Sequence, residues 1–437
     1  MAEHTNTPGP LRPKAMVPVR GMPGRPSRLV VMGAFVHRSY QLYSAAAFLG
    51  FGIITVQMMT RAWMVQEMTH SPLMVAMVPA LQVLPMLVLS FVGGELADRF
   101  SRKKVFILGE VGTLAGYLVL CGLALADAIQ IWHIMVLTLA LGITTALALP
   151  ARQSLVIDIV PQREQRNALG LYMVVVNLSQ IAAPALAGVL ISRLGTDMTL
   201  IISTLIFVPV IPLLVVMRTA AAPSTAARAR MGTLESLRIG VRYIAGNPRL
   251  RWMFIALFVV VIGVNSWGGL FPTFTEDVLG KGAAGLGLIV LGVGVGGTLG
   301  TFAAIALDGR ATDKVIQIGS GLAFSVVVVV LAFTPAFALW VVLAMLAACV
   351  GTVFFVNNAM AVQLTTPDEL RGRVISARFV VSGLQPFGHL ALGALAEGAG
   401  PQVAMASFGV ASAVGLAAVV GLTRSVPGVV REPTASG

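Results

Sequence analysis

The chain has 437 residues, of which 57% are hydrophobic and only 11% are charged. Soluble domains carry about 25% charged residues, so a soluble protein of this size could not cover its apolar surface. The apolar stretches reach about 20 residues, the length that a helix needs to cross a bilayer. The short alternating segments of a transmembrane β-barrel are not visible. The composition therefore predicts an all-α integral membrane protein.

Residues 1–39 form a basic tail that is rich in Pro, Arg and Gly. The tail lacks an apolar stretch long enough for a cleavable signal peptide, and we expect it to be disordered. A start codon assigned too early is the alternative, with translation beginning at Met16, Met22 or Met32.

Twelve apolar stretches follow the tail and predict two related bundles of six transmembrane helices. The bundles cover 40–217 and 251–424, and a second tail follows at 425–437. The predicted spans are 40–66, 72–96, 104–126, 130–157, 167–192, 196–217, 251–275, 284–307, 314–334, 336–363, 371–396 and 401–423.

The longest gap between spans, residues 218–250, predicts a linker between the bundles. Within it, Leu234, Leu237, Val241 and Ile244 are three or four residues apart, the spacing of one apolar helix face. We expect this amphipathic helix to lie along the membrane surface.

The placement of the basic residues predicts the orientation. If the N-terminus is cytoplasmic, all of the 30 Lys and Arg lie in cytoplasmic segments or at their edges except Arg61, Arg193, Lys281 and Arg378. This asymmetry follows the positive-inside rule. The net charge of +12 therefore indicates topology and contact with anionic lipid rather than a nucleic-acid partner. We expect both termini in the cytoplasm and the protein in a bacterial cytoplasmic (inner) membrane.

The two halves resemble each other at a nearly constant offset. Asp98, between spans 2 and 3, matches Asp308 at 210 positions further on. After spans 4 and 10 the offset is 205, and Gln180 matches Gln385. Matches at several corresponding positions indicate a duplication. Duplicated halves around a central site are the architecture of alternating access.

The segment between spans 2 and 3 resembles motif A of the major facilitator superfamily. The pattern is Gly-x-x-x-Asp-Arg-x-Gly-Arg-Arg, and this chain departs from it at Ser101, where the family usually has Gly. The matching positions that we consider for gating are Gly94, Asp98, Arg99 and Arg102. The resemblance extends from about Tyr40 to Arg424 and implies the twelve-helix major facilitator fold.

Three further segments, 61–72, 150–153 and 367–374, are similar to the drug:proton antiporter-3 branch. That branch includes macrolide exporters and the enterobactin exporter. Span 5 contains residues 179–188, which resemble the antiporter motif C with small residues in place of three glycines. In the family this motif accompanies export. The alternative is a proline-kinked packing face of small residues, which is common in membrane helices.

Charged residues at the cytoplasmic ends of the spans predict a gate. Span 11 begins near Arg371, and a helix N-terminus carries free N–H groups with partial positive charge. We expect Asp98 to bind there and to latch the halves together in the outward-open state, the role that the superfamily resemblance also implies. Arg99 and Arg102 could pair with Asp158 at the end of span 4. The alternative is that the basic residues only maintain topology.

Polar residues inside the spans predict the substrate cavity. A charge near the bilayer centre costs about 2.5–3.5 kcal/mol. Arg61 lies one turn after Gln57 and suggests a polar or anionic group on the substrate, a carboxylate partner, or a side chain that reaches the outer interface. The other candidates are neutral, and such amides also bridge helices. They are Asn177, Gln180, Asn265, Trp267, Asn357, Asn358, Gln385 and His389.

Two acidic residues are candidates for proton coupling. Glu110 lies about two turns inside span 3, and Glu67 lies near the outer end of span 1. Glu110 could instead be the structural partner of an arginine. Proton antiport is therefore an expectation from the resemblance alone.

The function that we expect is export of a moderately hydrophobic drug, macrolide or siderophore by a monomer without metal or cofactor. A carrier of the same fold for lipids, an importer of a metabolite and a non-transporting sensor are the alternatives. An enzyme is disfavoured, because the five histidines are scattered and no nucleophile motif occurs. ATP-driven transport is also disfavoured, because the chain lacks GxxxxGK[ST].

Overall fold

The computed structural model describes residues 33–219 and 233–422. Both predicted tails beyond these limits, the alternative start positions, and residues 220–232 of the predicted linker lie outside the described residues.

The first half is a bundle of helices whose turns are short. A 3-10 turn, η1 (Gly33–Val36), precedes the first long helix. The chain reverses at Gly195, which has a φ of 81°, so the parts of α6 before and after this residue belong to two different spans. The helices of this half are α2 (Arg38–Thr69), α3 (Pro72–Arg99), α4 (Arg102–Leu125), α5 (Ile131–Asp158), α6 (Gln165–Phe207) and α7 (Val210–Val216).

The second half begins with α8 (Thr233–Gly246), which lies within the predicted linker. Two of its spans are interrupted inside the bundle. The seventh consists of α9 (Pro248–Ile262), η2 (Val264–Leu270), α10 (Phe271–Thr273) and η3 (Phe274–Val278). The remaining helices are α11 (Gly282–Leu307), α12 (Asp313–Ala332), α13 (Phe337–Thr365), α14 (Asp368–Ser382), α15 (Gln385–Ala399) and α16 (Pro401–Leu422).

The prediction of an all-α fold with twelve spans is confirmed. Within the described residues, ten helical stretches are long and apolar enough to cross a membrane. One of them, 167–216, turns back at Gly195 and supplies two spans, and α3 is the remaining one. The predicted bounds agree with the helices to within a few residues because apolar length is the dominant signal in such a sequence.

Short-range capping explains why the helices can reverse so tightly. Ser71 accepts a hydrogen bond from the backbone N–H of Met74 at 3.3 Å, directly before Pro72 at the start of α3. Asn247 accepts from Arg249 at 3.0 Å and precedes Pro248 at the start of α9. A polar cap followed by Pro satisfies a free N–H and fixes φ for the first turn.

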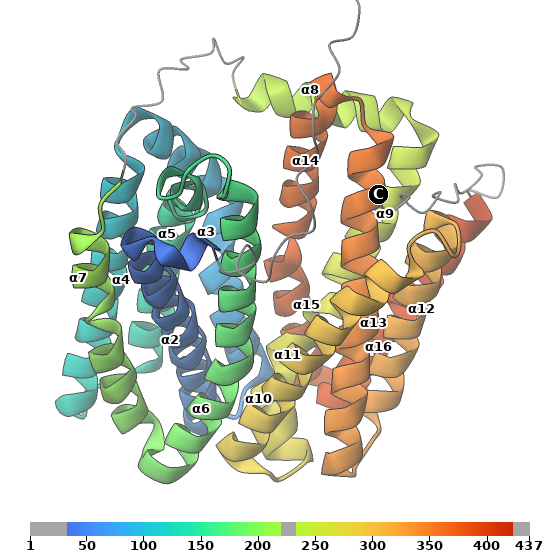
Figure 1. Ribbon diagram of the computed structural model, residues 1–437. Helices are drawn as coiled ribbons and strands as arrows, with labels where there is room; N and C mark the ends of the chain where they lie inside the picture. Colours follow the sequence, from blue (N-terminus) through green and yellow to red (C-terminus); the bar gives the residue numbers. More distant parts are fainter. Residues whose placement is uncertain (1–32, 220–232, 423–437) are drawn as a thin grey trace, which may run out of the picture.

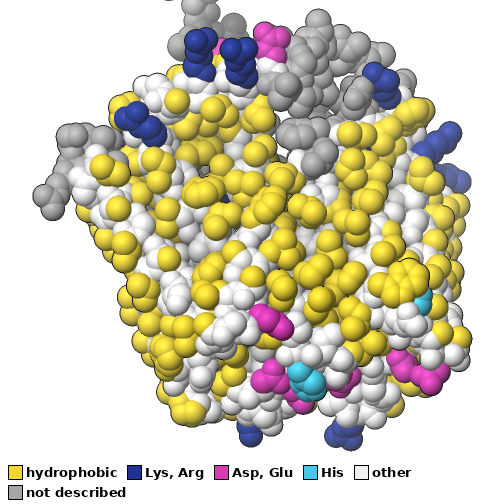
Figure 2. All heavy atoms as spheres, turned by 180° about the vertical axis from the view of Figure 1, so that it is seen from behind, with side chains coloured by type: hydrophobic (Ala, Val, Ile, Leu, Met, Phe, Trp, Pro, Cys, Tyr) yellow, Lys and Arg dark blue, Asp and Glu magenta, His cyan; other side chains and the backbone are white. Residues whose placement is uncertain are grey.

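The two bundles stand side by side and converge at one end (Figure 1). We call the end that carries α8 the linker side and the other end, which carries Ser71 and Asp277, the opposite side. Figure 1 shows the bundles apart near α8 and together where α6 meets α11. Viewed from behind, apolar side chains cover the middle of the surface, most of the visible Lys and Arg lie at the linker side, and acidic side chains and His gather toward the opposite side (Figure 2). This distribution is typical of a protein that spans a membrane.

The halves meet through backbone-to-backbone packing of α6 on α11. A Cβ on Gly188 would lie 2.8 Å from the Cα of Gly287. Seven residues away on both helices, a Cβ on Gly294 would lie 3.2 Å from the Ile181 side chain. Equal spacing in opposite directions means that the helices run antiparallel with small residues at the contact. This crossing lies near the opposite side, and α15 packs on α3 there through Gly393.

We predict that Gly188→Ala loosens the closed opposite side without unfolding the bundles, because the added methyl group cannot fit against α11. Spin labels at Ala128→Cys and Gln402→Cys, two exposed positions on different halves, would report the separation after Cys121 and Cys349 are replaced. We expect a larger population of wide separations. Gly170→Ala is the matched control on α6, because nothing lies within 4 Å of a Cβ there. Identical distance distributions in Gly188→Ala and the unmodified chain would contradict the prediction.

Candidate functional site

Two interrupted spans of the second half meet at the centre of the molecule. The first break follows α9 at Gly263, and the second separates α14 from α15 at Gly383 and Leu384. The breaks are joined directly, because the Gln385 side chain donates to the backbone oxygen of Asn265 at 3.4 Å. Non-helical backbone at membrane depth is tolerated only where it is buried in protein or lines a cavity. In transporters such breaks commonly mark the binding site.

Neighbouring helices satisfy the backbone at the first break. The hydroxyl of Ser412 on α16 accepts from the Val264 N–H at 2.8 Å, which replaces the lost helical bond. Glycine is required at Gly263, because a Cβ there would collide with the Ser412 hydroxyl. Gly388 on α15 is equally constrained, because its Cβ would collide with Ser266. The sequence therefore specifies this break.

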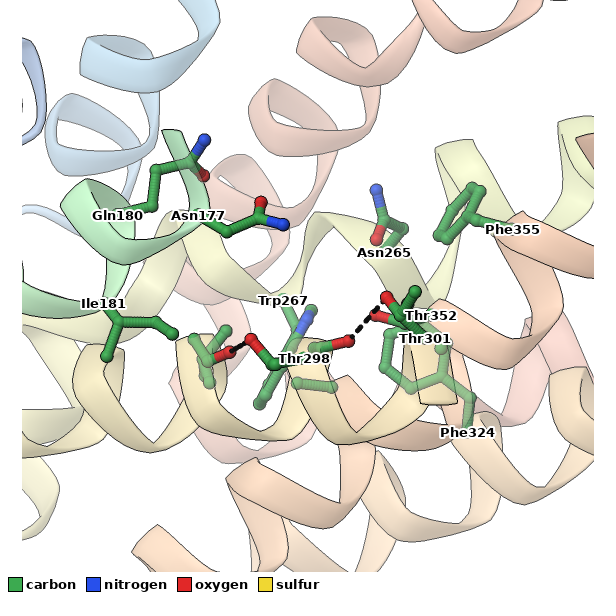
Figure 3. A pocket seen from close by; sticks show the side chains of 15 residues that line it. Asn177, Gln180, Ile181, Asn265, Trp267, Thr298, Thr301, Phe324, Thr352 and Phe355 are labelled. Atoms are coloured by element: carbon green, nitrogen blue, oxygen red, sulfur yellow. Dashed lines mark hydrogen bonds between the residues drawn. The ribbon is translucent and has the colours of Figure 1, made fainter. Parts of the chain in front are cut away.

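A cavity of about 380 Å³ lies beside the first break. Its wall on the first half comes from α6, and the rest comes from η2, α11, α12 and α13 of the second half (Figure 3). It lies on the linker side of the α6–α11 crossing, where the two helices diverge. The lining residues that carry polar or aromatic groups are Asn177, Gln180, Asn265, Trp267, Thr298, Thr301, Phe324, Thr352 and Phe355.

Three side-chain amides in this cavity are free for a ligand. Asn177 and Gln180 come from the first half and Asn265 from the second, and the amides of Asn177 and Asn265 point into the same space (Figure 3). Among the described residues, none of these three side chains makes a hydrogen bond within the protein. Unpaired polar groups in a membrane protein are costly, so such amides are available to bind a substrate.

The lower wall of the cavity is threonine and aromatic carbon. Thr298 and Thr301 donate to the carbonyls of Gly294 and Gly297 at 3.1 Å each, which leaves their oxygens free to accept. Trp267 is only 6% exposed and packs edge-on against Phe271 at 4.8 Å between ring centroids. Phe324 and Trp340 also contact the Trp267 ring, at 6.1 and 6.5 Å. The cavity therefore suits an apolar body with a few polar groups.

A second, mostly apolar cavity of about 230 Å³ lies between the halves nearer the opposite side. Met58 and Met59 from α2 line it, together with Phe271, Gln385 and His389. The His389 Nε2 lies 3.3 Å from the Gln385 side-chain nitrogen, and its Nδ1 has no partner among the described residues. Two of the predicted cavity residues therefore line a separate space on the path between the halves.

The other four predicted cavity residues do not line either cavity. Gln57 and Arg61 are both fully buried inside the first half. Gln57 donates to Ser203 at 2.9 Å, and Arg61 donates to Thr138 at 3.0 Å. Arg61 also donates to Gln82 at 3.1 Å and to the Gln57 backbone oxygen at 3.1 Å. These bonds hold α2 to α3, α5 and α6.

Asn357 and Asn358 are buried in the second half, where Asn358 joins α13 to α9 by donating to the Met253 carbonyl at 3.1 Å. The side-chain oxygen of Asn357 has no partner among the described residues.

The acidic candidates for proton coupling lie in different settings. Glu110 is buried and forms an ion pair with Arg152, whose guanidinium also stacks over the Phe51 ring at 4.4 Å. One oxygen of Glu110 and two nitrogens of Arg152 have no partner among the described residues. Glu67 is exposed at the opposite side and accepts from the Trp63 indole at 2.7 Å.

The predicted gate on the linker side is described only in part. Arg102 donates to Asp158 at 2.8 Å, which ties α4 to α5 within the first half. Arg371 pairs with Asp368 one turn away on its own helix at 2.5 Å. Arg99 is exposed at the end of α3. The side chain of Asp98 and the surroundings of Gly94 are outside what the structure describes, so the latch stays a prediction.

The opposite side carries a set of polar contacts between the halves that sequence patterns do not predict. Gln66 on α2 donates to Asp277 at 2.9 Å and accepts from Thr273 at 2.8 Å. Glu397 on α15 accepts from the Ser71 hydroxyl at 2.7 Å and from the Leu73 N–H at 3.3 Å. His70 lies 3.5 Å from Asp277. These bonds join the two halves, and we call this set the opposite-side lock.

Several cavity residues were missed by sequence reasoning, chiefly Thr298, Thr301, Thr352, Phe324 and Phe355. For the threonines of α11 a signal exists, because Gly294, Gly297, Thr298 and Thr301 follow the i, i+3, i+4, i+7 pattern of one helix face. A narrow stripe of small and hydroxyl side chains on a membrane helix predicts either close packing or a polar lining.

No group of three or more His, Cys, Asp or Glu that could hold a metal ion occurs in the described residues. The polar side-chain groups that line the two cavities are amides, hydroxyls, the Trp267 indole and one imidazole. Such groups bind and orient a ligand but form no nucleophile with an adjacent base.

Comparison with known proteins agrees with this arrangement. Residues 34–434 match the family described as transmembrane secretion effector. The chain is 25% identical over 349 residues to the multidrug efflux pump Tap of Mycolicibacterium fortuitum, covering 77% of this chain and 84% of Tap. It is 24% identical over 311 residues to the enterobactin exporter EntS of Shigella flexneri, covering 71% and 73%.

Solved structures with the same fold include two transporters. The nucleoside transporter NupG matches with a TM-score of 0.73 at 13% identity, over 88% of this chain and 99% of NupG. A bacterial homologue of the human lysosomal transporter Spinster matches with a TM-score of 0.68 at 14% identity, over 92% and 98%. These likenesses concern the fold alone.

The twelve spans, the paired bundles and the central cavity define a multi-pass membrane protein that is a secondary transporter of small molecules. The chain belongs to the transmembrane secretion effector family of the major facilitator superfamily. It is a transporter and not an enzyme, and the expected family resemblance is confirmed.

We predict that neutralising the opposite-side lock, in the double variant Asp277→Asn and Glu397→Gln, favours the state in which this side is open. A hydrogen bond to a charged group is worth about 1.5–3 kcal/mol, and part of that is lost when the charge is removed. The population of the open state should rise several-fold, measured with the spin-label pair at Ala128 and Gln402. Asp197→Asn, an exposed carboxylate on the same side, is the control. Equal populations in the double variant and the control would rule the lock out.

Proposed function

We propose that this protein exports an amphipathic small molecule across a bacterial cytoplasmic membrane by alternating access. The observation that carries the proposal is the cavity with free amides from both halves. Because Asn177 and Gln180 belong to one half and Asn265 to the other, a rocking motion changes the distance between the groups that hold the ligand. Binding and conformational change are then coupled, since a ligand shifts an equilibrium only through its differential affinity for the two states.

The orientation that we propose places the linker side in the cytoplasm. The Lys and Arg that gather on the linker side support this assignment (Figure 2). The structure then has its halves closed on the outer side and parted on the cytoplasmic side, which is the state that takes up a cytoplasmic substrate. The proposal further includes a monomer with both termini in the cytoplasm and residues 218–250 as the linker between two six-helix domains.

The direction of transport draws support from the relatives. Tap is named a multidrug efflux pump and EntS an enterobactin exporter, and both align with more than two thirds of this chain. Span 5 of this chain also keeps Pro184 and Gly188 of the motif that accompanies export. Pro184 lies within α6, and its carbonyl oxygen would lie 2.9 Å from a Cβ on Gly287. The motif therefore lies at the crossing between the halves.

The experiment that tests the function is flux in proteoliposomes with erythromycin and enterobactin as separate probes. We predict that the double variant Asn177→Ala and Asn265→Ala lowers flux of a transported probe about tenfold, because each lost hydrogen bond costs about 0.5–1.5 kcal/mol. Gln402→Ala, an exposed amide outside both cavities, should transport as the unmodified chain does. Tight binding of either probe without any flux would favour a sensor instead.

We also propose that the Glu110–Arg152 pair couples transport to protons. Protonation of Glu110 would leave the Arg152 cation buried without its partner, which favours a rearrangement around it. We predict that Glu110→Gln abolishes the stimulation of enterobactin flux by a pH gradient, while flux down the enterobactin gradient persists. Glu235→Gln, an exposed carboxylate on α8, is the control. If both variants respond to the pH gradient as the unmodified chain does, the pair carries no transported proton.

A further inference from the structure

Arg378 is a cation inside the eleventh span whose role is not explained by topology. It lies ten residues after Asp368 on α14, which corresponds to about 15 Å along the helix. Its side chain is half-buried. The Nε donates to the Asn358 side chain at 3.0 Å, and one terminal nitrogen donates to the Phe355 carbonyl at 3.2 Å.

These bonds fix the guanidinium in one orientation. Asn358 is itself held by its bond to the Met253 carbonyl and is fully buried. The other terminal nitrogen of Arg378, Nη1, makes no hydrogen bond to the described residues. A guanidinium that is held along one edge directs the N–H donors of its free edge in a fixed direction, where they can bind an oxyanion.

Arg378 lies beside the cavity that we describe above. Phe355, whose carbonyl accepts from Arg378, lines that cavity with its ring. Further along the same span, Gln385 bonds to Asn265, which lines the cavity as well. Since α14 begins at the linker side, Arg378 lies along this span between that end and Gln385.

The charge of Arg378 is not compensated by the protein. Among the described side chains, no carboxylate forms a salt bridge with Arg378. The Glu110–Arg152 pair is neutral as a whole, and Arg61 bonds only to neutral oxygens of Gln57, Gln82 and Thr138. The described charges inside the spans therefore sum to a positive value, which repels a cationic ligand and attracts an anionic one.

We propose that Arg378 binds the anionic group, a carboxylate or sulfonate, of an amphipathic substrate whose apolar body occupies the cavity of Trp267, Phe324 and Phe355. This inference rests on the proposed function and narrows its substrate class from amphipathic molecules in general to amphipathic anions. The free amides of Asn177 and Asn265 then bind uncharged polar groups of the same molecule. The net positive charge inside the described spans and the free edge of the Arg378 guanidinium together disfavour the binding of cationic drugs.

The test uses three probes with one fluorophore and different charges, which are dansylglycine (anionic), dansylamide (neutral) and dansylcadaverine (cationic). The full chain is placed in lipid nanodiscs, and binding is followed by energy transfer from tryptophan. We expect the unmodified chain to bind dansylglycine more tightly than dansylamide and dansylcadaverine more weakly. Arg378→Gln should weaken dansylglycine at least tenfold and change dansylamide less than twofold. Arg378→Lys should recover part of the loss.

Arg373→Gln is the matched control, since it removes a cation from the same helix five residues earlier. It should leave all three affinities unchanged. Retained dansylamide binding reports that the variants are folded. The proposal is overturned if Arg378→Gln weakens dansylglycine and dansylamide equally, or if none of the three probes binds to the unmodified chain. Absent flux with charge-selective binding would refute export while leaving the anion site in place.

Discussion

The structure depends on one constraint, which is that backbone N–H and C=O groups inside a bilayer must find partners within the protein. In the first half the constraint is met by continuous helices, and even Pro79, Pro85, Pro150 and Pro184 do not interrupt them. In the second half, side chains replace backbone partners where the helices are interrupted. Ser412 supplies an acceptor at the break after α9, and Gln385 supplies a donor to Asn265. The cavity lies beside these breaks, because there backbone and side chains can face a space instead of lipid.

A related rule applies to charge inside the spans, since a buried ion needs a partner of opposite charge or hydrogen bonds within the protein. Arg61 is held by hydrogen bonds to neutral oxygens, whereas Arg152 is held by its ion pair with Glu110 and by aromatic rings. Both lie inside the first half, away from the cavity. The polar core therefore ties the helices of that half together, and its contribution to the cavity is the face of α6 that carries Asn177 and Gln180. Most of the cavity lining, by contrast, belongs to the second half.

The sequence predicted the fold closely and the site in part. The positions of the spans follow from the length of the apolar stretches, which does not depend on how the helices pack. The predicted boundaries of α4 and α13 therefore agree with the structure to within a few residues. The direction of a polar side chain depends instead on which neighbour lies beside its helix. Gln57 and Asn177 look alike in sequence, yet the first faces Ser203 in the bundle core and the second faces the cavity. Nor could local patterns predict the opposite-side lock, because Gln66 and Asp277 are 211 residues apart.

The crossing of Gly188 and Gly287 has a mechanical consequence. The backbones of the two helices approach most closely at this glycine pair, so the contact can act as a pivot. Thr301 lies fourteen residues beyond Gly287 on α11, an arm of about 21 Å at 1.5 Å per residue. A tilt of about 15° around the pivot would move Thr301 by about 5 Å on this arm. A small rotation at the glycine pair would therefore move the Thr301 wall of the cavity by a distance larger than the length of a hydrogen bond.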